Sequence, residues 1–337
     1  MMDYFLFIPI LASFFITLLF LPVWIKKARQ INLFWRDMNK INNVKAAGSG
    51  GIIATWSFLI SVLIFIAYRT FYLKSESYLA EILSLLLVIT MLSSIGFIDD
   101  LLGWQRGGLS KRSRILLFII ASIPLMVINA GKHVISLPFL GQVDMGLFYP
   151  FLLIPFGMIG ATAAFNFLAG FNGLEAGQGI IILSALGITA ALTGSSWLAI
   201  IAFCMIASLA AFLLYNFYPA RVFPGNSITL AVGGLIAIMS ILGNFEKIAV
   251  FFFIPYILEI ILKLRGRLVK QSFGRPLKDD ALDLRYDEIY GLTHASIWLL
   301  KKLSIQPTEK KVVYLIWLFQ FIIIIIGFII FRKGIFL

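Results

Sequence analysis

The sequence predicts an all-α protein that crosses a membrane about ten times. Of its 337 residues, 61% are hydrophobic and only 13% are charged, whereas a soluble domain is about half apolar and about a quarter charged. The apolar residues lie in blocks of about twenty, the length that a helix needs to cross the hydrocarbon core. We therefore interpret residues 1–337 as a single integral membrane domain.

The predicted spans follow one another through short connections, except for a long loop near 265–311. The first span is not a secretory signal, because Asp3 precedes it and the basic segment 26–29 follows it, whereas a signal peptide has its positive end first. The segment 289–303 is apolar in places but short, and we interpret it as an interfacial or re-entrant part of the long loop. The ten spans are 5–25, 49–68, 79–98, 114–130, 148–165, 177–193, 197–216, 227–243, 247–264 and 312–331.

Positive charges are concentrated in alternate connections of this arrangement. The loops after the first, third, fifth, seventh and ninth spans carry, with their flanks, 22 of the 28 Lys and Arg residues. By the positive-inside rule this side is cytoplasmic, and an even number of spans then places both termini outside. A miscounted span would scramble the asymmetry, so its sharpness supports the count of ten.

Composition also excludes several classes of protein. The 28 basic residues against 16 acidic ones indicate loops that face anionic lipids or anionic substrates, and no nucleic acid is expected as a partner. The single cysteine, Cys204, cannot form an intramolecular disulfide. No Cys or His cluster has zinc spacing, and the sequence contains neither a GxxxxGK[ST] string nor an identifiable Ser-His-Asp trio.

Two adjacent acids, Asp99 and Asp100, close the third predicted span. They could be two solvated carboxylates, but acids are mildly unfavourable at the C-terminal end of a helix, and acids at a membrane usually mark a functional site. An adjacent pair can hold Mg²⁺ or organise a phosphate through it. Lys111 follows eleven residues later, either as a phosphate-facing cation or as a positive anchor at the membrane surface.

Two further strings lie in loops of the same side. In NFLAGFNGLEAGQG, residues 166–179, the Gly and Asn residues favour a tight turn between helices and also allow close approach to a ligand. In YNFYPARVFPGNS, residues 215–227, the aromatic residues fit an interfacial belt, and Phe223 equally offers a face on which a base can stack. Chemistry or binding is therefore expected at the cytoplasmic face.

These motifs, in this order, resemble those of the polyprenyl-phosphate N-acetylhexosamine-1-phosphate transferases, a family like glycosyltransferase family 4. The matching strings are FIDD, the basic GLSKRSR, NFLAG with NGLEAGQG, and YPARVFPGNS. NGLEAGQG after NFLAG is similar to the archaeal and eukaryotic UDP-GlcNAc:dolichyl-phosphate GlcNAc-1-phosphate transferases, whereas the bacterial phospho-MurNAc-pentapeptide transferases have Asp where Ala169 stands. The likeness covers almost the whole chain, from DMNK to the final helix.

The resemblance implies roles for the polar residues of these strings. Asp99 and Asp100 match the catalytic acid pair of the family, and Lys111 matches a lysine that faces the phosphates. Asn166 matches a magnesium ligand. Asn226 stands where the family has a second metal-binding Asp, and a neutral amide is a weaker Mg²⁺ ligand than a carboxylate.

The resemblance also implies a substrate-binding set in four cytoplasmic loops. The set comprises Asn39, Lys40, Gly170, Asn172, Phe223, Arg275 and His294. Phe223 is expected to stack on uracil. Because the last loop lacks both the bacterial triple-His string and the eukaryotic His-Arg string, Arg275 and His294 are chosen there from residue type alone.

The reaction implied is transfer of GlcNAc-1-phosphate from UDP-GlcNAc to a polyprenyl phosphate such as dolichyl phosphate, with release of UMP, as the first membrane step of glycan assembly. The implied cofactor is Mg²⁺, with Mn²⁺ as a substitute, and the other expected partners are membrane lipids and a second copy of the chain in a homodimer.

Related donors such as UDP-MurNAc-pentapeptide remain alternatives. A lipid or solute transporter is the rival class, but transporters place their sites near the midplane, often between inverted repeats, and no such repeat is apparent.

Overall fold

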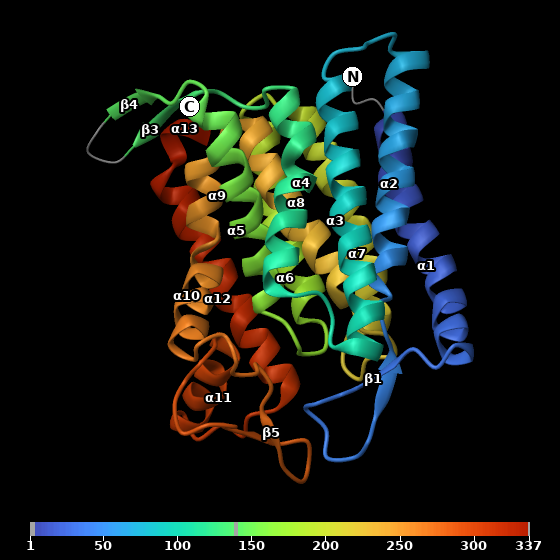
Figure 1. The fold of residues 1–337 in the computed structure, drawn as a ribbon, viewed down its shortest axis with the longest axis vertical. Helices are drawn as coiled ribbons and strands as arrows, with labels where there is room; N and C mark the ends of the chain where they lie inside the picture. Colours follow the sequence, from blue (N-terminus) through green and yellow to red (C-terminus); the bar gives the residue numbers. More distant parts are fainter. Residues whose placement is uncertain (1–3, 138–140, 336–337) are drawn as a thin grey trace.

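A computed structural model describes residues 4–137 and 141–335, and it is an antiparallel bundle of membrane-length helices with a polar cap at one end (Figure 1). The apolar blocks become helices because a chain in lipid satisfies its backbone hydrogen bonds within each segment. The ends of the described chain, near Tyr4 and near α13, lie at the end opposite the cap. The helices of the bundle are α1 (Phe7–Gln30), α2 (Gly51–Ala67), α3 (Leu79–Arg106), α4 (Lys111–Val127), α5 (Ile154–Phe167), α6 (Leu174–Leu192), α7 (Ser196–Asn216), α8 (Gly225–Gly243), α9 (Glu246–Phe252), α10 (Ile254–Arg265), α12 (Glu309–Ile330) and α13 (Arg332–Ile335).

Eight helices of the described chain are long and apolar enough to cross a membrane, whereas the sequence predicts ten spans. The two remaining predicted spans are helical but differ in form. The helix predicted at 114–130 is α4, which has 17 residues. The span predicted at 247–264 is divided at Phe253 into α9 and α10, because Pro255 lacks an N–H and cannot continue the hydrogen-bond ladder.

Short hairpins and one extra helix complete the fold. In the cap, β1 (Phe34–Arg36) pairs with β2 (Lys45–Ala47), and β5 (Arg275–Pro276) pairs with β6 (Leu282–Asp283). The predicted interfacial segment at 289–303 is the helix α11 (Leu292–Lys302) of the long loop. At the opposite end, β3 (Val134–Leu137) pairs with β4 (Gly141–Asp144).

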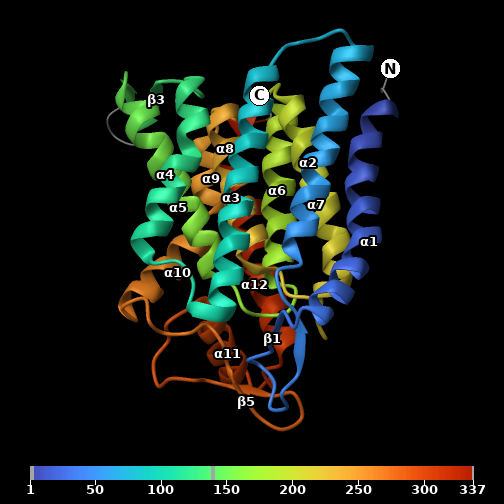
Figure 2. The same ribbon diagram turned by 45° about the vertical axis from the view of Figure 1, so that its right-hand side comes forward.

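The helix α8 lies at the centre of the bundle and packs on α2, α3, α5, α6 and α9, and the two views of the ribbon agree on this arrangement (Figures 1 and 2). In its membrane-length window 83% of the residues are buried, against 22% for α1 at the edge. The close packing of α3 against α8 requires glycine at position 96 of α3. A Cβ there would lie only 2.4 Å from the backbone oxygen of Asn226 and would clash with it. The start of α8 is therefore pressed against the acid-bearing turn of α3.

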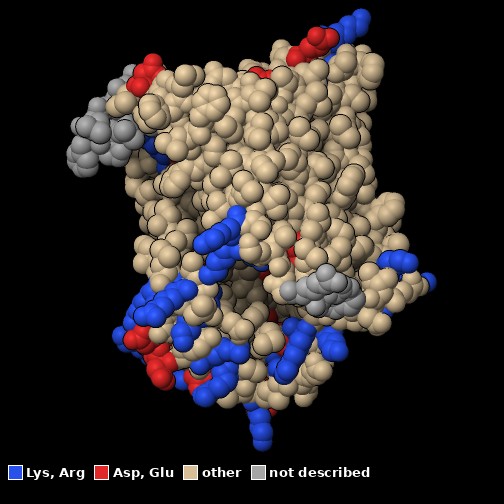
Figure 3. Space-filling view, in the orientation of Figure 1, with Lys and Arg blue, Asp and Glu red and all other residues tan. Residues whose placement is uncertain are grey.

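Charge is distributed as expected for a membrane protein. On the face in Figure 3, Lys and Arg gather at the end that carries α10, α11 and β5, and a broad band over the helices is nearly free of charge. Large apolar side chains are also exposed on the outer helices, such as Leu19 on α1, Leu63 on α2 and Leu318 on α12, as a lipid-facing surface requires.

Candidate functional site

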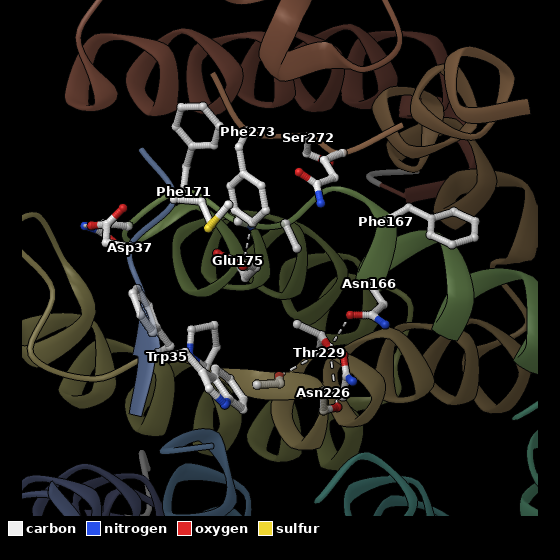
Figure 4. A pocket seen from close by; sticks show the side chains of 18 of the residues that line it. Trp35, Asp37, Asn166, Phe167, Phe171, Glu175, Asn226, Thr229, Ser272 and Phe273 are labelled. Carbon is white, nitrogen blue, oxygen red and sulfur yellow. Dashed lines mark hydrogen bonds between the residues drawn. The ribbon is translucent and has the colours of Figure 1, made fainter. Parts of the chain in front are cut away.

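A cavity of about 480 Å³ lies between the cap and the helix ends (Figure 4). Four separate segments form its wall: the first loop, the α5–α6 connection, the start of α8, and the long loop after α10. Its polar and aromatic lining includes Trp35, Asp37, Asn166, Phe171, Asn172, Glu175, Phe223, Asn226, Thr229, Lys263, Ser272 and Phe273. We call it the main cavity.

One corner of the main cavity is backed by the acid pair. The carboxylate of Asp100 accepts hydrogen bonds from the hydroxyl of Ser49 (2.8 Å) and from the backbone N–H of Asn226 (2.9 Å). The side-chain amide of Asn226 donates to Asp99 at 2.6 Å. Asp99 and Asp100 are only 3% and 5% exposed. They lie within α3 and not at its end, since α3 continues to Arg106, so they are buried behind Asn226 and not solvated.

The backbone at Gly225 allows α8 to approach Asp100 closely. Gly225 has φ +72°, and a Cβ there would lie 2.2 Å from a carboxylate oxygen of Asp100. Only glycine adopts this conformation without strain and leaves room for the acid. The Gly-Asn pair at the start of α8 is thus explained by the close approach of α3.

The cation that pairs with the acids was missed by sequence reasoning. Arg114 of α4 forms an ion pair with Asp99 at 2.8 Å, whereas Lys111 is exposed at the first turn of α4 and has no ion-pair partner in the described part of the chain. The two residues are three positions apart on one helix and so lie on neighbouring positions of one face. That spacing could have identified Arg114.

Asn166 lies across the corner from the acids. Its side-chain oxygen accepts a hydrogen bond from the hydroxyl of Thr229 at 3.0 Å, and both residues line the main cavity next to Asn226 (Figure 4). The structure thus brings Asp99, Asp100, Asn166 and Asn226 to one corner, and leaves Lys111 at the surface.

The oxygen atoms of this corner fit a magnesium ion. Within the described residues, no group of three or more His, Cys, Asp or Glu side chains could hold a metal, so a site made of such side chains alone is absent from that part of the chain. Mg²⁺ is usually bound by one or two carboxylates together with substrate phosphates. The acid pair, with the amide oxygens of Asn166 and Asn226, offers that kind of incomplete set of hard oxygen ligands.

The opposite corner is built from loops. Asn39 is buried, donates to the backbone oxygen of Gly170 (2.9 Å) and accepts from the backbone N–H of Gly274 (3.1 Å). Asn172 donates from its side chain to Asp37 (3.0 Å) and from its backbone to Glu309 (2.8 Å). Asn172 lines the main cavity, whereas Asn39 lies behind the wall and joins three loops.

Lys40 belongs to the same supporting layer and does not line the main cavity. Its ammonium forms an ion pair with Glu309 at 2.9 Å and lies 3.8 Å from the centre of the Tyr218 ring. Burial by itself would lower the pKa of Lys40, but the hydrogen bond and the charge of Glu309 raise it above its ordinary value. Lys40 therefore stays charged and fixes the first loop to the start of α12.

Gly170 and the aromatic side chains shape the wall. Gly170 has φ +105°, and a Cβ there would lie 2.8 Å from the ring of Phe273. Phe223 lines the main cavity, and its backbone N–H donates to the backbone oxygen of Ala47 at 2.8 Å. Trp35 and Phe273 line the cavity too, although sequence reasoning gave them no role, because nothing in their local strings distinguishes them from interfacial aromatic residues.

Neither residue chosen in the last loop lines the main cavity. Arg275 is exposed and pairs with Asp283 at 2.8 Å. His294 is buried, with one ring nitrogen 3.3 Å from the backbone oxygen of Phe273 and the other accepting from the N–H of Tyr290. Burial lowers the pKa of His294, so the ring is neutral at neutral pH and supports the wall through Phe273.

Charged residues of the wall were also missed, and Lys263 and Glu175 are two of them. Lys263 of α10 donates to the hydroxyl of Ser272 at 2.5 Å and lies 3.7 Å from Glu259. Glu175 accepts from the backbone N–H of Gly170 at 2.9 Å with one oxygen, while its other oxygen has no hydrogen-bond partner among the described residues. The predicted helix at 177–193 begins earlier, at Leu174, so Glu175 lies on the first turn of α6 and not in a loop.

Comparison with known proteins identifies the family. The family model for glycosyl transferase family 4 matches residues 82–244. A protein of Saccharolobus solfataricus, provisionally designated UDP-N-acetylglucosamine–dolichyl-phosphate N-acetylglucosaminephosphotransferase, is 37% identical over 92% of this chain and 92% of its own length. A Dictyostelium discoideum protein with that name is 30% identical over 73% of this chain and 67% of its own.

A bacterial relative is similar over a shorter stretch. The phospho-N-acetylmuramoyl-pentapeptide-transferase of Clostridium perfringens is 32% identical over 65% of this chain and 69% of its own. The phospho-N-acetylmuramoyl-pentapeptide-transferase of Halalkalibacterium halodurans covers 81% of this chain but is 29% identical, against 37% for the Saccharolobus relative. The higher identity agrees with the resemblance carried by NGLEAGQG. On the strength of these matches and of the motifs that surround the main cavity, the chain belongs to glycosyl transferase family 4.

Proposed function

We propose that this protein transfers N-acetylglucosamine-1-phosphate from UDP-N-acetylglucosamine to a polyprenyl phosphate of the dolichyl type, as the first membrane step of glycan assembly. The products are a polyprenyl-diphosphate N-acetylglucosamine and UMP. The observation that carries the proposal is the buried acid pair, Asp99 and Asp100, joined to Asn226 at one corner of a 480 Å³ cavity. The names of the archaeal and slime-mould relatives support the choice of donor and acceptor.

The main cavity suits a sugar nucleotide. Its volume is within the usual range for small-molecule sites, and its two corners differ in chemistry. Phe223 and Trp35 offer aromatic faces for the uracil ring, and Asn172 and Gly170 also line the cavity. In this arrangement the nucleoside occupies the loop corner and the diphosphate points toward the acid corner.

The bond changes follow from the substrates. An oxygen of the lipid phosphate attacks the β-phosphorus of the donor, a new P–O–P linkage forms, and the bond to the UMP oxygen breaks. The acid pair either removes a proton from the lipid phosphate or positions the phosphates. Asp99, Asp100 and the side-chain oxygens of Asn166 and Asn226 would hold Mg²⁺, or Mn²⁺ in its place, at the acid corner. The bound ion would supply positive charge against the phosphates.

The membrane side is part of the proposal. The end that carries the main cavity faces the cytoplasm, because 22 of the 28 basic residues lie in the connections of that side. Cytoplasmic sugar nucleotide then reaches the cavity directly, and lipid phosphate reaches it from the adjacent leaflet. Both termini lie on the outer side.

A purified enzyme assay tests the function. Protein in detergent is supplied with UDP-N-acetylglucosamine and Mg²⁺, with and without polyprenyl phosphate, and UMP is measured. We expect UMP release that depends on the lipid, and an Asp100→Asn variant serves as the inactive control. Preference for UDP-MurNAc-pentapeptide would reassign the donor, whereas lipid movement without UMP release would indicate a transporter.

A further inference from the structure

A second cavity, of about 370 Å³, lies in the cap beside the main cavity. Its lining comes from the first loop and from the β5 region of the last loop, and it is rich in cations. The lining residues are Arg36, Met38, Lys40, Gly274, Arg275, Pro276 and Arg285. Arg36 and Met38 also line the main cavity, so the two cavities share a wall.

Two of the four cationic residues of this second cavity are paired with carboxylates, and two are not. Lys40 is paired with Glu309, and Arg275 is paired with Asp283. Arg36 and Arg285 are exposed and have no ion-pair partner in the described part of the chain. Two arginines of one concave surface, Arg36 and Arg285, therefore have no carboxylate bound to them among the described residues.

The backbone of the second cavity is held in place. The N–H of Gly274 donates to Asn39, and Arg275 and Pro276 pair with β6. Asp283, which holds Arg275, also accepts from Lys301 at 2.5 Å, and these contacts lower the pKa of Asp283 to about 2. The arginine side of the cavity is thus fixed by a carboxylate that stays ionised at all physiological pH values.

We propose that the second cavity is an anion-binding site, separate from the main cavity, for the phosphate or carboxylate groups of a small soluble molecule. Guanidinium groups bind such oxygens through paired hydrogen bonds and keep their charge at any pH. The cavity is much larger than one phosphate, so it has room for a diphosphate or for a phosphorylated small molecule.

The position of the site favours a soluble ligand over a lipid headgroup. In both ribbon views β5 lies in the cap, beyond the lower ends of α3 and α4 (Figures 1 and 2), and on the face in Figure 3 Lys and Arg gather at this end of the molecule. The proposal goes beyond the proposed transferase function and does not depend on it, because Arg285 lines the second cavity and not the main one.

Binding of inorganic pyrophosphate tests the site. The intact protein is reconstituted in phosphatidylcholine nanodiscs, and pyrophosphate is titrated in metal-free buffer by calorimetry. We expect Arg285→Gln to weaken binding about tenfold, as for loss of a charge-assisted hydrogen bond. Arg267→Gln is the matched control, since it removes the same group from an exposed position of the same loop and should bind as the wild type does. Arg285→Lys keeps the charge and should bind with intermediate affinity.

A second experiment distinguishes a soluble anion from a lipid headgroup. The same variants are reconstituted in nanodiscs that contain phosphatidic acid, no pyrophosphate is added, and thermal unfolding is measured. Stabilisation by the acidic lipid that requires Arg285, without pyrophosphate binding, would assign the same anion site to a lipid headgroup. Measurable pyrophosphate binding with equal affinity in the wild type and Arg285→Gln, or no Arg285-dependent effect in either experiment, would overturn the proposal.

Discussion

The two corners of the main cavity are built in different ways. The acid corner is made by helices: Asp99 and Asp100 lie within α3, Asn226 starts α8, and Arg114 lies on α4. The loop corner is made by side chains that bridge distant segments. Asn39, for example, contacts residues 131 and 235 positions away through a backbone oxygen and a backbone N–H.

The difference suggests that the acid corner carries out the chemistry and the loop corner binds the donor. Helices hold a group more rigidly than loops do, and catalytic groups need positions fixed to a fraction of an ångström. Loops are more mobile and commonly carry binding residues. We therefore expect changes at the acid corner to lower turnover and changes at the loop corner to weaken donor binding, and the following variants test that expectation.

The largest effect is expected for Asp100→Asn. The substitution removes a charge while conserving volume, and loss of a strong electrostatic contact with the transition state should lower turnover by about a hundredfold or more. Release of UMP at saturating donor measures it. Ser49→Ala is the control, since it removes one hydrogen bond to Asp100 and leaves the carboxylate. Unchanged turnover in a folded Asp100→Asn protein would mean that the acid pair has no part in the chemistry.

A smaller effect is expected for Asn39→Ala, and it should appear in KM and not in kcat. The variant loses hydrogen bonds to Gly170 and Gly274, and removal of buried partners costs about 1–3 kcal/mol. If the loop corner binds the donor, KM for UDP-N-acetylglucosamine should rise about tenfold while kcat changes little. Asn42→Ala, at an exposed position of the same loop, should leave both constants unchanged. A fall in kcat alone would contradict the division between corners.

Asn226→Asp tests the acid corner through its metal. A carboxylate binds Mg²⁺ better than an amide does, so the variant should need several-fold less Mg²⁺ for half-maximal activity. Because Asn226 donates to Asp99 and a carboxylate cannot, the variant should also unfold at a lower temperature without metal and recover on addition of Mg²⁺. Superimposable Mg²⁺ titrations for the two proteins would remove Asn226 from the metal site.

The smallest effect concerns pH at the loop corner. The pKa of His294 is lowered by burial and by the nearby charges of Lys263 and Arg285, so the unfolded chain binds a proton more readily than the folded one. This contribution to stability is present above the ordinary pKa of about 6.5 and is lost as the pH falls below it. We expect the melting temperature of the wild type to fall more than that of His294→Asn between about pH 7.5 and about pH 5.5. Parallel curves would show that His294 does not titrate on unfolding.

Much of the fold could be predicted because its signals are local. Apolar blocks predict helices wherever the chain must satisfy its own hydrogen bonds in lipid, and the alternation of positive charge predicts which loops share a side. The two irregular spans, α4 and the broken α9–α10 segment, were predicted as ordinary ones. Their form depends on a proline and on packing against neighbours, to which hydropathy is insensitive.

The sequence by itself determined that the chain is a membrane bundle with Asp99, Asp100, Asn166 and Asn226 at the ends of apolar blocks. Only the tertiary structure decided that Arg114 and not Lys111 pairs with the acids, and that Asn39 lies behind the cavity wall while Asn172 lines it. The physical reason is the range of the interactions. Burial in lipid acts on each segment separately, whereas hydrogen bonds and ion pairs depend on which side chains meet within about 3 Å, and those partners lie up to 269 residues apart.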